Sequence, residues 1–180
     1  MRSLRLASSL VGLALAAVAA CAPMRVNTFV ARNTNFTELR TYAWAPADQL
    51  ATGDPRLDNN EVFQMRVKTA VEKGLEARGL EHMTAGTADV VLHYHLSVTQ
   101  DIDANGVDER YGYCEGCRPS VFDAGTLTLD LVDTRTNRLV WRGWAERSFE
   151  GIVDNQQWLE RQVDEAVDRI LRKYPVRSRL

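Results

Sequence analysis

The segment Thr126-Leu127-Thr128-Leu129-Asp130-Leu131-Val132 alternates polar and apolar side chains with a period of two. In a β-strand this period places Leu127, Leu129 and Leu131 on one face and the polar residues on the other. The polar run Asp133–Asn137 predicts a hairpin turn, in which Asn137 can adopt a left-handed backbone. Residues 139–146 then return as the partner strand, so the segment predicts a hairpin with one buried face.

The neighbouring segments continue this pattern. Residues 88–98 alternate in the same way, with apolar side chains on one face at Val90, Leu92, Tyr94, Leu96 and Val98. Two shorter β-rich segments, 26–31 and 40–44, lie nearer the N-terminus. Because strand residues alternate between faces, Trp141 and Trp144 point to opposite sides, and we expect one in the core and the other exposed.

Two segments have apolar residues at helical spacing. Asp58 and Glu61 form a capping box that predicts a helix over about residues 58–79, with Gly79 as its stop. Asp154 and Gln157 predict a second helix over about residues 154–173, before Pro175. The apolar stripes of these helices comprise Phe63, Val67, Ala70, Val71 and Leu75 in the first, and Leu159, Val163, Ala166, Val167, Ile170 and Tyr174 in the second.

The order of the expected elements is β-β-α-β-β-β-α. A sheet that alternates on one side needs a cover on that side only, and two amphipathic helices can supply it. We therefore expect an α+β fold with a mainly antiparallel sheet and two helices packed on one face. The other face of the sheet is expected to stay open.

The N-terminus has the pattern of a bacterial lipoprotein signal. Arg2 and Arg5 precede an apolar run that ends in small residues and Cys21. The run is shorter than the ~20 apolar residues that cross a bilayer, so an ordinary secretory signal is the main alternative. We expect residues 1–20 to be removed, Cys21 to be lipidated, residues 21–25 to form a short tether and residues 26–180 to form a single α+β domain.

The tether and the charge balance suggest where the domain lies. Ala22 follows the cysteine where an aspartate would favour the inner membrane, so we expect the outer membrane, facing the periplasm. The segment from Ala22 to Arg25 reaches at most about 14 Å, which would hold the domain against the membrane.

The chain has 22 basic and 24 acidic residues, and removal of the signal takes away arginines only. This acidic balance argues against nucleic-acid binding.

Several motifs, taken in order, resemble one protein family. They are Thr41-Tyr42-Ala43-Trp44, Gly79-Leu80, Ala88-Asp89-Val90, the segment from Gly125 to Asp133 with Leu139-Val140-Trp141-Arg142-Gly143, and Tyr174-Pro175. The chain is thereby similar to the bacterial lipoprotein family catalogued as domain of unknown function 4136. The resemblance implies a fold and an envelope location. It implies no catalytic residue and no cofactor, because the family has no established activity.

Residues 99–124 are expected to form a long loop, and long loops in compact domains are often functional. Within it, Cys114-Glu115-Gly116-Cys117 permits a structural disulfide between Cys114 and Cys117, a redox pair or a metal site. An oxidising compartment favours the disulfide.

Two metal-binding hypotheses concern the same region. His93 and His95 share one face of a strand, and two thiolates would complete a tetrahedral zinc site. Asp101, Asp103 and Asn105 match the first half of a calcium loop, although position twelve of that pattern is Gly112 instead of glutamate. Surface histidines and a solvated acidic loop are the alternatives.

No nucleophile elbow of the form Gly-x-Ser-x-Gly and no His-Glu-x-x-His motif is present in the sequence, and we expect no enzymatic activity. We expect a lipid-anchored binding or scaffold module whose partner is an envelope protein or a cell-wall component. The candidate binding residues are those of the open sheet face, His93, His95, Thr128, Asp130, Arg142 and Trp144. The alternative is a metal-dependent (zinc or calcium) envelope factor or enzyme centred on the 99–124 loop.

Overall fold

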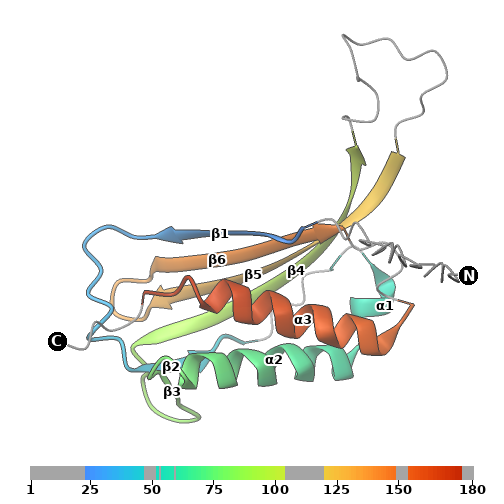
Figure 1. Cartoon of the computed structure of the whole chain (residues 1–180). Coiled ribbons are helices and arrows are strands. Elements are labelled where there is room, and N and C mark those ends of the chain that lie inside the picture. Colours follow the sequence, from blue (N-terminus) through green and yellow to red (C-terminus); the bar gives the residue numbers. More distant parts are fainter. Residues whose placement is uncertain are drawn as a thin grey trace, which may run out of the picture.

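The computed structural model describes residues 23–46, 52, 54–58, 60–103, 120–148 and 154–175 (Figure 1). Along the chain the elements are β1 (Arg25–Val30), β2 (Thr41–Trp44), α1 (Pro55–Asp58), α2 (Glu61–Glu76), β3 (Glu81–His82), β4 (Val90–Asp103), β5 (Ser120–Asp133), β6 (Arg138–Ser148) and α3 (Gln156–Leu171). Helices and strands form one α+β structure, as the sequence predicts.

The sheet has six strands in the order β1-β6-β5-β4-β2-β3. The pairs β1–β6, β5–β6 and β4–β5 are antiparallel, whereas β2 is parallel to both β3 and β4. The sheet is therefore mixed, and the expectation of a mainly antiparallel sheet needs correction. The reason is the crossover through α2, since a helix between two neighbouring strands returns the chain in the same direction.

The element order also differs from the predicted one. The short helix α1 precedes the first predicted helix, and β3 is a strand of two residues; neither is among the predicted elements. The strands β4 and β5 extend into the region predicted as the 99–124 loop, where Thr99–Asp103 pairs with Ser120–Ala124. In Figure 1 this end of the hairpin projects beyond the rest of the sheet.

The two long helices begin at asparagines, and the predicted aspartate caps are wrong. Asn60 Oδ1 accepts a hydrogen bond from the backbone N–H of Phe63 at 2.9 Å, and Asn155 Oδ1 accepts one from Trp158 at 3.0 Å. Asp58, in contrast, accepts a hydrogen bond from the backbone of Thr52. Asp154 pairs with Arg56 at 2.7 Å. Because each aspartate carboxylate binds another group, the asparagine that follows it in the sequence caps the helix instead.

Gly79 ends the first long helix, as predicted. Its φ is 82°, which lies in the left-handed region that glycine adopts without strain. The backbone N–H of Gly79 donates to Glu76 O, and that of Leu80 donates to Leu75 O, as in a Schellman motif. In the predicted hairpin turn, Asn137 likewise has a positive φ of 51°.

Helices α2 and α3 lie side by side on one face of the sheet, and the other face is open (Figure 1). The core between the layers contains the predicted strand residues Leu127, Leu129 and Leu131 and the buried stripes of both helices. Trp141 is 0% exposed, as predicted for the core tryptophan, whereas Trp144 is half-buried and not exposed as predicted. In the part of the chain that the structure describes, no helix is long and apolar enough to cross a membrane.

Two glycines permit close contacts in this core. A Cβ at Gly143 would lie 2.6 Å from the Trp141 ring and 2.5 Å from Ile170 of α3, so the missing side chain lets Trp141 lie across β6 beneath the helix. A Cβ at Gly74 would lie 2.3 Å from Leu171. Gly74 therefore allows α2 to approach α3, and not the sheet.

Asp89 ties the start of β2 to the start of β4. One carboxylate oxygen accepts hydrogen bonds from the backbone N–H groups of Arg40 and Thr41 and from the Thr41 hydroxyl, each at 2.9 Å. The hydrogen bond from the Arg40 backbone and those from Thr41 hold the pKa of Asp89 below its usual value. Two of the family-like motifs of the sequence, those around Thr41 and Asp89, thus form one contact.

Candidate functional site

The open sheet face brings the predicted binding residues together in two rows that run across the strands. One row follows the register His93–Asp130–Arg142–Phe29, from β4 through β5 and β6 to β1. The adjacent row follows His95–Thr128–Trp144–Asn27. All six predicted residues therefore lie in one patch, which we call the open-face patch and which also includes Phe29 and Asn27.

An ion pair lies at the centre of the open-face patch. Arg142 Nε donates to Asp130 Oδ1 and Arg142 Nη2 donates to Asp130 Oδ2, both at 2.6 Å, in a bidentate arrangement. The Asp130 side chain is only 8% exposed, whereas that of Arg142 is 46% exposed. The hydrogen-bonded carboxylate raises the pKa of Arg142 above its ordinary value. The pair therefore fixes a cationic group at the surface.

Aromatic side chains flank this ion pair. Phe29 is 48% exposed, and Trp144 is half-buried on the same face. The His93 and His95 rings lie nearly parallel, with centroids 6.3 Å apart. The sequence did not single out Phe29, because the apolar residues of β1, Val26, Phe29 and Val30, do not alternate with polar ones. Exposed aromatic residues beside an arginine are typical of the central residues of protein interfaces.

The structure leaves the metal hypotheses as predictions. His93 and His95 share a face as expected, but no group of three or more His, Cys, Asp or Glu side chains that could hold a metal occurs among the described residues. Asp101 and Asp103 belong to strand β4 and not to a loop, which departs from the calcium-loop pattern. Asn105 and the pair Cys114 and Cys117 lie outside the described residues, as does Cys21.

We expect Cys114 and Cys117 to be disulfide-bonded in the exported protein. The double variant Cys114→Ser/Cys117→Ser should fold with a small loss of stability, because so short a ring restricts little of the unfolded chain. Mass spectrometry of the purified protein with and without alkylation measures the thiol state. Free thiols with one equivalent of zinc, lost in the variant His93→Ala, would instead establish the zinc site.

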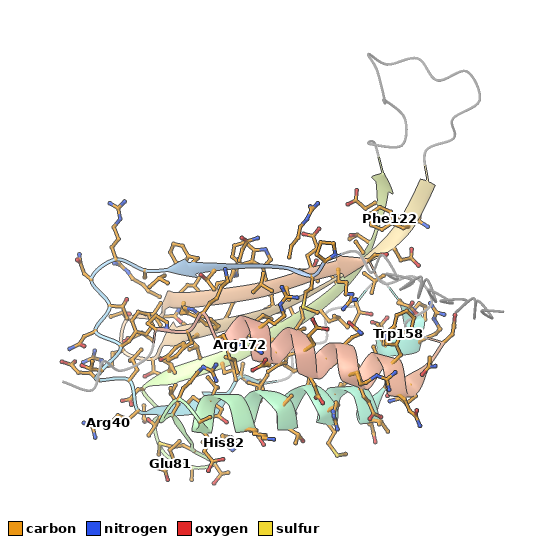
Figure 2. The ribbon with its side chains drawn as sticks, in the orientation of Figure 1. Arg40, Glu81, His82, Phe122, Trp158 and Arg172 are labelled. Atoms are coloured by element: carbon orange, nitrogen blue, oxygen red, sulfur yellow. The ribbon has the colours of Figure 1, made fainter. Side chains whose placement is uncertain are left out.

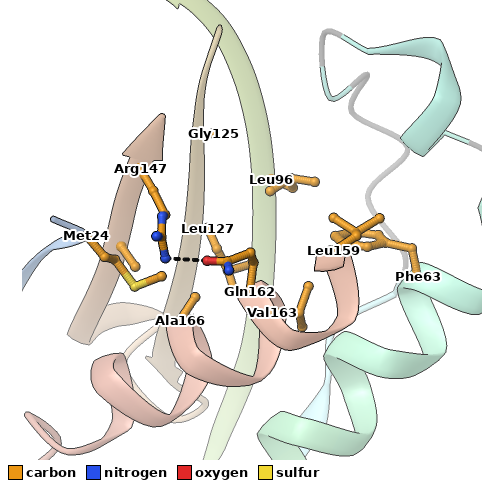
Figure 3. Close-up of a pocket in the computed structure, with 11 residues that line it drawn as sticks. Met24, Phe63, Leu96, Gly125, Leu127, Arg147, Leu159, Gln162, Val163 and Ala166 are labelled. Carbon is orange, nitrogen blue, oxygen red and sulfur yellow. Dashed lines mark hydrogen bonds between the residues drawn. The ribbon is translucent and has the colours of Figure 1, made fainter. Parts of the chain in front are cut away.

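A small apolar cavity lies between α3 and the sheet (Figure 3). Its volume is about 50 Å³, and its polar edge is the hydrogen bond from Arg147 to Gln162. The residues around it include Met24, Phe63, Leu127 and Val163. Ligand pockets usually have volumes of ~300 Å³ or more, so this cavity is a gap in the packing and not a candidate site.

A second, polar hollow lies where α2 ends and β3 begins. Its volume is about 460 Å³, and its lining consists of Tyr42, Glu72, Glu76, Gly79, Leu80, Glu81 and His82. Figure 2 shows the Glu81 and His82 side chains at this end of the molecule. His82 has no evident partner in the sequence, but its ring stacks on Tyr42 with centroids 5.2 Å apart, and its Nδ1 lies 3.9 Å from Glu72.

Fold and site together define an α+β protein with a mixed six-stranded sheet, two long helices on one face and a polar and aromatic patch on the other. The chain belongs to the family described as Domain of unknown function (DUF4136), which matches residues 26–176. The resemblance seen in the sequence motifs is thereby confirmed.

Solved structures share the fold at low sequence identity. A PDZ domain protein from Parabacteroides distasonis matches with a TM-score of 0.56 and 16% identity, over 87% of this chain and 37% of that protein. The PelC dodecamer from Paraburkholderia phytofirmans matches with a TM-score of 0.50 and 14% identity, over 87% of this chain and all of the other. This chain thus spans little more than a third of the first of these proteins. No curated protein matches the chain in sequence.

Proposed function

We propose that the protein is a lipid-anchored binding or scaffold module of the cell envelope, without enzymatic activity, at the periplasmic face of the outer membrane. In this proposal Cys21 carries the lipid, and the open-face patch contacts an envelope protein or a cell-wall component. The lipoprotein-like N-terminus supports the location. The patch supports the binding role.

The observation that carries the proposal is the composition of the open-face patch. A bidentate ion pair with a buried carboxylate is not required on a sheet face that only contacts solvent. Its presence supports a further role for this face. The pair fixes the Arg142 guanidinium against Asp130, and in the strand register Phe29 lies beside Arg142 and Trp144 lies in the next row. Arginine and tryptophan dominate the binding energy of many protein interfaces, and a rigid side chain loses less entropy on binding.

Photo-crosslinking in intact cells tests this role. A photoreactive amino acid at position 29, on the open face, is expected to give discrete adducts with a partner protein or with wall fragments. The same amino acid at position 65 is the matched control, because Met65 is 65% exposed but lies on α2. Equal adduct patterns from both positions would contradict the proposal.

The variant Trp144→Ser should weaken partner binding by about tenfold or more, because truncation of a central interface aromatic often costs ~2 kcal/mol. This change leaves the Asp130–Arg142 pair intact, so the fold should be kept. Binding is measured with the partner identified by crosslinking, and thermal unfolding of the variant provides the control. Unchanged affinity would exclude Trp144 from the interface.

A further inference from the structure

The polar hollow at the end of α2 combines acidic and aromatic side chains from three segments. Tyr42 comes from β2, Glu72 and Glu76 come from α2, and Glu81 and His82 form β3. The residues Glu72 and Glu76 are four positions apart, so both carboxylates lie on the same side of the helix. We call this the acidic hollow.

Apart from His82, whose Nδ1 lies 3.9 Å from Glu72 Oε1, the acidic hollow has no cationic partner in the part of the chain that the structure describes. Among the described residues, no lysine or arginine lies within ion-pair distance of Glu72, Glu76 or Glu81. The orientation of Glu72 is fixed, because the Trp44 indole N–H donates to its Oε1 at 2.9 Å. Three carboxylates around a concave surface raise the local concentration of cations.

An independent observation concerns Tyr42, which lines the hollow and is only 1% exposed. No hydrogen bond of its hydroxyl occurs within the part of the chain that the structure describes, and the hydroxyl oxygen is not among the fully enclosed polar atoms, so it faces the hollow. Buried tyrosines normally bond through the hydroxyl. Burial raises the pKa of Tyr42, and the carboxylates of Glu72 and Glu76 raise it further, so the group stays protonated. A neutral hydroxyl can accept a hydrogen bond from an ammonium group.

Aromatic rings complete the site. The His82 ring stacks on Tyr42 at an interplanar angle of 25°, and Trp44 meets Tyr42 edge to face with centroids 6.3 Å apart. Trp44 already attracts one cation, since Lys68 Nζ lies 5.9 Å from its ring centroid. Carboxylates, which accept hydrogen bonds from ammonium groups, and aromatic rings together are the usual partners of organic cations. A bare metal ion fits less well, because these side chains do not form a metal-binding group.

We infer that the acidic hollow binds the primary ammonium group of an organic amine, with Glu72 and Glu76 as the charged partners and the Tyr42 hydroxyl as a further acceptor. The ammonium group can belong to a free diamine or to a lysine side chain of a peptide. The volume of about 460 Å³ accommodates either. This site is separate from the open-face patch and does not depend on the function proposed for it.

Isothermal titration of the mature chain, with serine in place of Cys21 to avoid the lipid, tests the inference. The probes are cadaverine, a lysine-containing tripeptide and the same tripeptide with acetylated lysine. We expect binding of at least one amine probe and no binding of the acetylated peptide. Preference between cadaverine and the tripeptide identifies the source of the amine. Equal binding of both tripeptides, or no binding of any amine at millimolar concentration, would overturn the inference.

Variants locate the site. Glu76→Gln should weaken amine binding about tenfold or more, because an ammonium ion loses a charged acceptor. Tyr42→Phe keeps the stacked ring, removes only the hydroxyl and should weaken binding severalfold. Glu61→Gln, at the other end of α2, is the matched control and should bind as the unchanged protein does. An equal loss in the control, or stoichiometric binding of calcium that displaces the amine, would contradict the assignment.

Discussion

Replacement of Leu129 by alanine is expected to lower the free energy of unfolding by about 2–5 kcal/mol. Leu129 is 0% exposed and lies between Tyr94 of β4 and Gly143 of β6 in the sheet register. The change removes buried methyl groups and leaves a cavity. Gly143 has no side chain that could move into the space, and the neighbouring Trp141 ring is held between β6 and α3. We therefore expect little relaxation around the cavity.

Chemical denaturation of the two proteins measures this loss. Val62→Ala in α2 is the control, because Val62 is 58% exposed and its truncation should change the free energy of unfolding by less than ~0.5 kcal/mol. A loss below ~0.5 kcal/mol for Leu129→Ala would show that the face of β5 beneath the helices contributes little to the core.

The change Cys21→Ser is expected to abolish lipid anchoring, so that the protein is either released from the membrane fraction or left unprocessed. Without the thiol no acyl chain can be attached, and the excess of acidic over basic residues gives the chain no strong attraction to anionic lipids. Fractionation of the envelope followed by immunoblotting should find the variant in the soluble periplasm or as an unprocessed precursor. A correctly processed variant that still requires detergent for extraction would refute the lipid anchor.

The neighbouring residue provides a control for this experiment and a test of the destination. Ala22→Ser keeps the cysteine and should leave the protein in the outer membrane. Ala22→Asp should move it to the inner membrane, because aspartate after the lipidated cysteine favours retention there. Identical sorting of both variants would mean that residue 22 does not decide the location.

The pattern of side chains along single elements was sufficient to predict how each element faces the core. Leu127, Leu129 and Leu131 are buried because alternation in a strand is a local property that the sequence displays directly. The same period placed His93, Thr128 and Arg142 on one open face. The pairing register of the strands then aligns these residues. For β5 and β6 this register follows from the short turn after Asp133, which the sequence also predicts.

Contacts between distant segments were not predictable in this way. The parallel pairing of β2 with β4 depends on the path of the chain through α2, and no local pattern encodes it. Asp58 and Asp154 match a capping box, but their carboxylates have partners elsewhere, so Asn60 and Asn155 cap the helices. Local sequence patterns therefore identify candidate capping residues. Which candidate caps the helix depends on the other hydrogen-bond and ion-pair partners that each side chain can reach.

The acidic hollow illustrates the same limit. Its residues come from β2, α2 and β3, and only the spacing of Glu72 and Glu76 is visible along the chain. The approach of His82 to Tyr42 results from the parallel pairing of β2 with β3. A site assembled at the end of a helix from separate strands is visible only after the topology is known.

The position of β1 at one edge of the sheet also bears on the order of events during folding. β1 pairs only with β6, and Arg169 of α3 donates a hydrogen bond to Met24 O, 145 residues away in the sequence. Contacts of such high contact order close the longest loops and are expected to form late. In a chain exported from its N-terminus, β1 therefore waits unpaired until the last strand and helix arrive. In the proposed export of the chain, the processing step at Cys21 would therefore precede the pairing of β1 with β6.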